Sequence, residues 1–113
     1  GLASDIGGGS NFSMLRTMAA AYEVAQLRGM AAHPAQLMWL ASEGSAKTLH
    51  LQGKVGHLGA GAEADLCVLN LNSTQAIDQR GRNASNFWEV LFPTIMMGDD
   101  RAVRQVWVAG RPL

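Results

Sequence analysis

The first twelve residues constrain the fold more than any other stretch of the chain. Residues 1–4 are a short, mostly apolar run, one carboxylate follows at Asp5, and residues 7–9 are three consecutive glycines. A long helical pattern begins directly afterwards. This order predicts a strand, a tight loop and a helix start. A carboxylate at the end of a strand lies where α/β barrels keep their chemistry.

The stretch after the glycines has the three- and four-residue apolar spacing of a buried helix. We expect this helix near residues 12–28, with Ser10, Asn11 or Ser13 as the N-terminal cap. Gly29 suits the left-handed position after the last turn.

A second and a third helix are expected next. Pro34 fits the first position of a helix, because its missing N–H costs nothing there. Gly44 is expected to end that helix, and Ser45 to cap a short helix that runs to His50.

The second half of the chain mixes turns, strands and one helix. Residues 52–63 are rich in glycine and predict turns with a short strand, and residues 64–71 predict a clear strand. Residues 72–84 are polar and predict a loop. A helix is expected over residues 86–97, with Pro93 breaking or kinking it.

Alternating residues from Val103 to Val108 predict a strand that enters a hairpin. The return strand is expected at Pro112 and Leu113. Arg101, Arg104 and Arg111 are expected to form a solvated edge beside this hairpin.

Composition narrows the class of protein. Nine basic and nine acidic side chains cancel, so no charge excess favours nucleic acid or an anionic membrane as a partner. No apolar run approaches the roughly 18 residues of a membrane span. The single cysteine, Cys67, cannot form an internal disulfide, which predicts a reducing, cytoplasmic location.

Asp5 is the main candidate for chemistry. Its carboxylate is a candidate ligand for a divalent metal and a candidate proton acceptor from metal-activated water. The alternative is a structural Asp that caps the following loop through backbone N–H groups. Gly7, Gly8 and Gly9 suit either a phosphate cradle at a helix start or a close backbone approach to an active-site floor, and we favour the second.

The histidine, cysteine and tryptophan side chains are expected to have structural roles and not catalytic ones. His33, His50 and His57 form no metal-ligand motif. Cys67 alternates into a strand and is expected to be a small core residue. The three tryptophans are expected to anchor a core or an interface. No substrate-contacting residue can be named.

Two segments resemble the amidohydrolase superfamily. Ser4 to Arg16, continuing through Ala19–Tyr22 and Gln26–Gly29, resembles the late metal-ligand segment of guanine deaminases. Lys54 to Leu66 resembles a segment that follows the barrel in many amidohydrolases. The first match is the more specific, and the two cover most of the chain.

The resemblance implies an incomplete α/β fold. Residues 1–50 would be the end of a metal-dependent (β/α)8 barrel, comprising its last strand, the metal-ligand loop and helices. Residues 51–113 would be C-terminal strands of an accessory β-sandwich, with a helix near 86–97. The rest of the barrel would lie upstream.

The same resemblance implies hydrolysis of guanine to xanthine and ammonia. Asp5 would be a catalytic residue and a ligand of one divalent metal, zinc or alternatively iron. The histidine ligands, the proton-shuttling Glu and the purine contacts would come from upstream, so the 113 residues alone are expected to be inactive. A homodimer is implied, with neither nucleic acid nor membrane as a partner.

Rival functions remain at this point. Within the superfamily, the substrate could instead be another aminopurine, a pterin or a triazine. Outside it, the chain could be a non-catalytic structural or assembly module. A small phosphate-binding protein that uses the triple glycine is the third reading.

Overall fold

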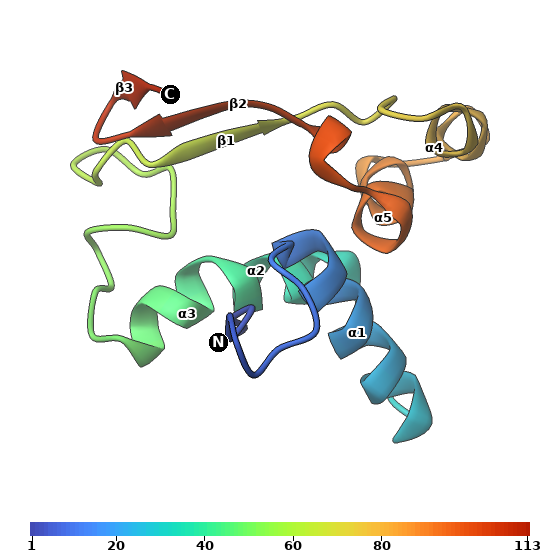
Figure 1. Cartoon of the computed structure of the whole chain (residues 1–113), viewed down its shortest axis with the longest axis horizontal. Coiled ribbons are helices and arrows are strands. Elements are labelled where there is room, and N and C mark those ends of the chain that lie inside the picture. The colour runs from blue at the N-terminus through green and yellow to red at the C-terminus, as the bar shows by residue number, and fades with distance from the viewer.

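The computed structural model describes residues 1–113 and contains five α-helices, one 3-10 helix and three strands (Figure 1). In chain order the elements are α1 (Met14–Leu27), α2 (Pro34–Ala41), α3 (Glu43–Thr48), β1 (Leu66–Leu69), α4 (Gln75–Gly81), α5 (Phe87–Met97), η1 (Asp100–Ala102), β2 (Val103–Val108) and β3 (Arg111–Pro112). The longest helix, α1, has 14 residues, and no helix combines the length and apolar character needed to cross a bilayer.

Helix α1 forms as its spacing predicts. Ser13 is the N-cap, and its hydroxyl accepts a hydrogen bond from the Arg16 N–H at 3.4 Å. Gly29 adopts a φ of 74°, the left-handed conformation that glycine reaches without a Cβ penalty. Leu15 and Met18 lie on the buried face of this helix.

Helix α2 begins at Pro34 as expected, and its cap is stronger than the sequence suggested. His33 Nδ1 accepts a hydrogen bond from the Ala35 N–H, while the Gln36 side chain accepts one from the His33 N–H at 2.8 Å. This reciprocal arrangement is a capping box, and it satisfies two helix-end donors at once.

The prediction for Gly44 and Ser45 was wrong. Helix α2 already ends at Ala41, and α3 begins at Glu43, so Gly44 and Ser45 lie inside α3. Gly44 is needed for packing, because an added Cβ would lie 2.9 Å from the Trp39 ring and from its carbonyl oxygen. Ser45 does not cap a helix; its hydroxyl bonds to other parts of the chain, as described below.

The strand expected at residues 1–4 is also absent. No other strand lies beside this segment, and a parallel strand needs hydrogen-bonding neighbours to form. The segment instead lies against the α2–α3 region, where the Leu2 N–H donates to the Leu40 carbonyl oxygen at 2.8 Å.

Helix α4 lies within the stretch predicted to be a loop, which is a third correction. Thr74 caps it by accepting a hydrogen bond from the Ile77 N–H at 3.3 Å. Ile77 is completely buried and fixes the helix to the core. One apolar anchor is too few to give a helical period, so the pattern could not reveal this element.

Helix α5 covers nearly the predicted range and is not interrupted by Pro93. Asn86 caps it by accepting hydrogen bonds from the Trp88 and Glu89 N–H groups at 3.0 and 3.1 Å. Pro93 is buried within the helix, where packing outweighs its missing backbone donor.

The three strands form one antiparallel sheet in the order β1-β2-β3. Leu66 pairs with Trp107 at one end of the β1–β2 ladder, and an irregularity separates Val68 from Leu69. Cys67 in β1 is exposed, which corrects its expected place in a core. Partial desolvation by neighbouring atoms nevertheless raises the pKa of its thiol.

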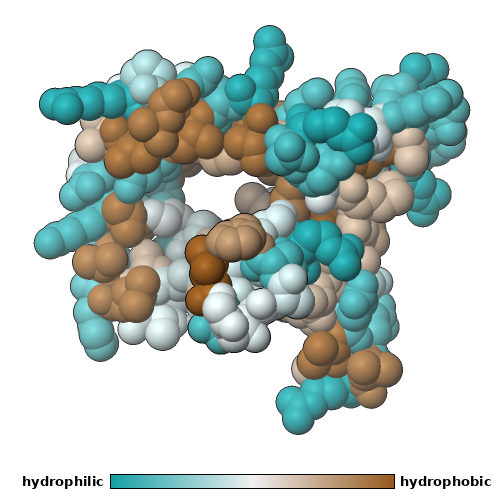
Figure 2. Space-filling model, viewed as in Figure 1, coloured by the Kyte–Doolittle hydropathy of each residue, from teal (hydrophilic) through white to brown (hydrophobic).

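The main core lies where α1, α2 and α5 meet, not on the sheet. Its buried members are Leu15, Met18, Leu37, Leu91, Ile95 and Ala102. In Figure 1 the sheet lies apart from α2 and α3, and Figure 2 shows an opening between the two layers with brown apolar side chains around it. The layers therefore leave apolar surface that this chain does not cover.

Candidate functional site

The Asp5 carboxylate is free of protein partners. Asp5 has a positive φ of 47°, and the N–H groups of Gly8 and Gly9 both donate to its main-chain oxygen. No hydrogen bond or ion pair within the chain involves its side-chain oxygens, and the residue is exposed. The loop is thus closed by the backbone of Asp5 and not by its carboxylate, which does not fit the capping alternative.

The glycines after Asp5 bring the backbone close to this carboxylate. A Cβ added at Gly8 would lie 2.6 Å from Asp5 Oδ2, and one added at Gly9 would overlap the Ser4 carbonyl oxygen. Gly7 has a φ of 103°, which side chains other than glycine rarely adopt. The loop therefore requires small residues at these positions.

Ser45 holds the segment that leads to Asp5, and sequence reasoning missed this role. Its hydroxyl accepts from the Leu2 N–H at 3.1 Å, and lies 2.9 Å from the Leu2 carbonyl oxygen and 2.8 Å from the Leu40 carbonyl oxygen, both of which can accept its proton. The contact joins residues 43 positions apart. A serine near a helix start gives no signal of such a contact, because it resembles an ordinary cap.

The three histidines do not join Asp5. Nδ1 of His33 caps α2, and Nδ1 of His57 accepts a hydrogen bond from the Gly59 N–H at 3.0 Å. His50 follows the end of α3 with a φ of 57°. No group of three or more His, Cys, Asp or Glu side chains lies close enough to hold a metal ion. Asp5 can supply one ligand, whereas catalytic zinc usually has three from protein.

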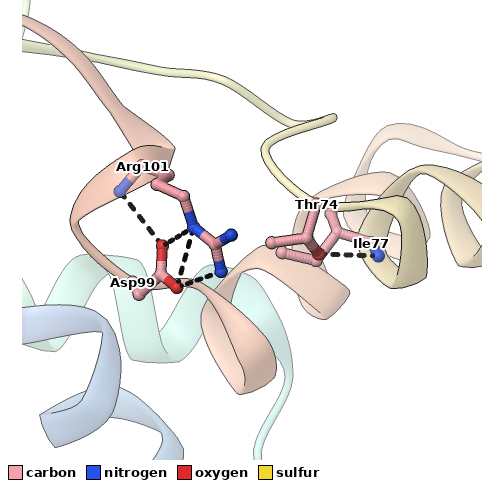
Figure 3. Close-up of polar contacts among 4 residues, drawn as sticks. All are labelled: Thr74, Ile77, Asp99 and Arg101. Carbon is pink, nitrogen blue, oxygen red and sulfur yellow. Dashed lines mark hydrogen bonds and ion pairs between the residues drawn. The ribbon is translucent and has the colours of Figure 1, made fainter.

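A separate polar cluster lies at η1, between α5 and β2. Arg101 Nη2 and Asp99 Oδ2 form an ion pair at 2.6 Å, and the Arg101 Nε and backbone N–H also donate to the Asp99 carboxylate (Figure 3). Hydrogen bonds from Arg101 hold the pKa of the Asp99 carboxyl below its usual range. Arg101, Arg104 and Arg111 are all exposed, as predicted.

Comparison with protein families identifies the chain. The profile described as "Amidohydrolase family" matches residues 1–113. The chain belongs to the amidohydrolase family. Among curated relatives, it is 36% identical to guanine deaminase of Escherichia coli (strain K12) over 111 residues. It is 32% identical to a probable guanine deaminase of Deinococcus radiodurans over 112 residues.

These matches cover nearly all of this chain but only part of each relative. The aligned regions are 98% and 96% of this chain, and 25% and 26% of the two relatives. The chain therefore spans about a quarter of the length of the curated amidohydrolases that it matches.

Solved structures agree with this assignment. E. coli guanine deaminase superposes with a TM-score of 0.93 at 35% identity, covering 98% of this chain and 26% of that one. Guanine deaminase from Bradyrhizobium japonicum gives 0.86 at 27% identity, with 98% and 30% covered. A Xanthomonas campestris adenosine deaminase with bound zinc gives 0.70 at 20% identity over 90% of this chain and 22% of that one, which shows the fold alone.

The expectation of an incomplete amidohydrolase fold is confirmed by these comparisons. The division at residues 50 and 51 stays a prediction, as do the roles of Asp5 and Gly7 to Gly9.

Proposed function

We propose that this chain is the C-terminal part of a guanine deaminase, which converts guanine and water to xanthine and ammonia. The single observation that supports it most is the 36% identity to the E. coli guanine deaminase over 98% of the chain. The free, exposed carboxylate of Asp5 in its glycine loop is the residue to which we assign the chemistry.

Asp5 fits the role of a metal ligand by its chemistry and its freedom. Carboxylate oxygens bind zinc and iron readily. Those of Asp5 accept no hydrogen bond from the chain, so metal binding would break none. A divalent metal would supply a Lewis acid that acidifies the attacking water. Asp5 would accept a proton from that water and return it to the departing amine of guanine. The histidine ligands and the guanine pocket would come from the rest of the enzyme.

Replacing Asp5 by Asn in the complete enzyme tests this assignment. The amide keeps the size of the side chain but removes its charge and basicity, so we expect turnover to fall by about a hundredfold or more, the contribution typical of a general base. Ammonia release from guanine is the readout, and bound metal is measured alongside it.

Asp100→Asn is the matched control, because Asp100 is an exposed carboxylate in η1 away from the glycine loop. It should keep full turnover. Near-normal activity of the Asp5→Asn enzyme would refute the role of Asp5, whatever its metal content.

The substrate needs its own test. Ammonia release from guanine should exceed that from other aminopurines, pterins and triazines by kcat/KM. A better rival substrate would make the chain part of a different amidohydrolase. A complete protein that releases no ammonia from any of them would favour the structural-module reading. Homodimer formation stays a prediction, which the mass of the complete protein in solution tests.

A further inference from the structure

A cavity of about 440 Å³ lies beside the C-terminal half of α1, and Asp5 is not among the residues that line it. The ends of four helices surround it, because it lies between the C-terminal half of α1, the start of α2, the end of α4 and the start of α5. Tyr22 in its wall is roughly 12 Å along α1 from Met14, given 1.5 Å of rise per residue. Its volume is within the range of small-molecule sites.

Aromatic rings form much of the wall. Tyr22 and Phe92 pack edge to face with centroids 5.0 Å apart, and His33 and Trp88 do so at 5.6 Å. These four rings come from α1, α5 and the cap of α2, so the folded arrangement and not one local motif brings them together. Rings held in this way offer edges and faces to a flat apolar ligand.

Three residues that line this cavity have hydrogen-bond donors free of protein partners: Arg80, His33 and Asn83. Arg80 is one of the residues that line it, and its guanidinium takes part in no ion pair. Because His33 Nδ1 accepts the Ala35 N–H, any proton of the neutral ring is on Nε2, which has no partner in the chain. Asn83 also lines the cavity without a side-chain bond.

The N-termini of α2 and α5 are not taken as ligand sites, because side chains already cap both helices. His33 and Asn86 occupy the first N–H groups of α2 and α5. The Glu89 carboxylate accepts from the Ser85 N–H at 2.8 Å and from Asn86 Nδ2 at 3.1 Å. Glu89 also lines the cavity, and its negative charge opposes a dianion more strongly than a monoanion.

We propose that this cavity binds a planar aromatic monocarboxylate. Its ring would lie among Tyr22, Trp88 and Phe92, and its carboxylate would pair with Arg80. The site is separate from the Asp5 loop, and the proposal does not depend on which reaction the enzyme performs.

Calorimetric titration of the complete protein with 2-naphthoate tests the proposal. 2-Naphthamide keeps the rings without the charge, and acetate keeps the carboxylate without the rings. We expect 2-naphthoate to bind at least about tenfold more tightly than either, because 2-naphthamide loses the charged hydrogen bond to Arg80 and acetate loses the packing among the rings. 2-Naphthyl phosphate, with nearly twice the charge, should bind more weakly than 2-naphthoate.

Arg80→Gln should weaken 2-naphthoate binding about tenfold and leave 2-naphthamide unchanged. Arg82→Gln is the matched control, because Arg82 lies two residues away, pairs with Asp78 at 2.6 Å and does not line the cavity. Trp88→Leu should weaken both naphthyl compounds.

Three results would overturn the proposal. The first is no heat from 2-naphthoate at millimolar concentration, as expected if another part of the protein fills the cavity. The second is an equal loss of binding in the Arg80 and Arg82 variants, and the third is acetate binding as tightly as 2-naphthoate.

Discussion

Two threonine hydroxyls have opposite effects on the stability of this amidohydrolase chain. Thr74 caps α4, as Figure 3 shows, and a cap of this kind stabilises by about 1 kcal/mol. The Thr94 side chain is completely buried in α5, and its hydroxyl has no partner. A buried hydroxyl left without a hydrogen bond costs about 1–3 kcal/mol.

We therefore expect Thr94→Val to raise the free energy of unfolding by about 1 kcal/mol, because valine has the same shape without the unpaired hydroxyl. Thr74→Val should lower it by about 1 kcal/mol through loss of the cap. Urea unfolding of the complete protein measures both. A destabilised Thr94→Val variant would show that this hydroxyl has a partner in solution.

At the scale of elements, the helices and strands that could be predicted are those with a regular spacing of apolar residues in their own sequence. Helix α1 and strand β2 have long regular spacings and formed within two residues of their predicted limits. Helix α4 depends on one buried residue, Ile77, and the segment before Asp5 has no strand of this chain beside it with which to pair. Neither of these features can be recognised from the spacing of apolar residues in the sequence. Asp5 and its glycine loop could be found from sequence, but the freedom of the carboxylate could not.

The turn at η1 gives a pH-dependent prediction. Because the folded pKa of Asp99 is lowered by Arg101, the pair stabilises the fold above the unfolded Asp pKa of about 3.9. That contribution is lost as the pH falls through the lower, folded value. In Arg101→Gln the Asp99 pKa should rise toward its usual range, as followed by NMR of the carboxyl carbon.

Arg104→Gln is the control for this titration, because Arg104 is exposed on β2 and forms no ion pair. It should leave the Asp99 titration unchanged. An Asp99 pKa that stays low without Arg101 would show that the backbone N–H groups of the turn are responsible.

At the scale of the whole molecule, the chain covers little of its own apolar surface. Only 13 of 113 residues are buried, while Phe12, Leu27 and Leu58 are 79%, 87% and 83% exposed. Large contiguous apolar patches on a protein often mark surfaces that another part of a protein covers. The chain spans about a quarter of the length of the curated relatives that it matches.

We expect the 113-residue chain, produced alone, to release no ammonia from guanine and to bind no stoichiometric zinc. One carboxylate cannot hold a zinc ion, and no group of three or more His, Cys, Asp or Glu side chains in this chain lies close enough to do so. Ammonia assay and metal analysis, with the complete enzyme as the positive control, measure this. Turnover by the isolated chain would contradict both the fragment interpretation and the assignment of Asp5 as one ligand among several.

The Ser45 hydroxyl bonded to Leu2 has a consequence beyond folding. Only Ala3 and Ser4 separate Leu2, which Ser45 holds, from Asp5. The position of the Asp5 backbone therefore depends on the position of α3. With Asp5 as the metal ligand that we propose, warming that loosens α3 should displace its carboxylate and release the metal while the rest of the protein is still folded. Heat inactivation would precede melting, and added zinc would delay it.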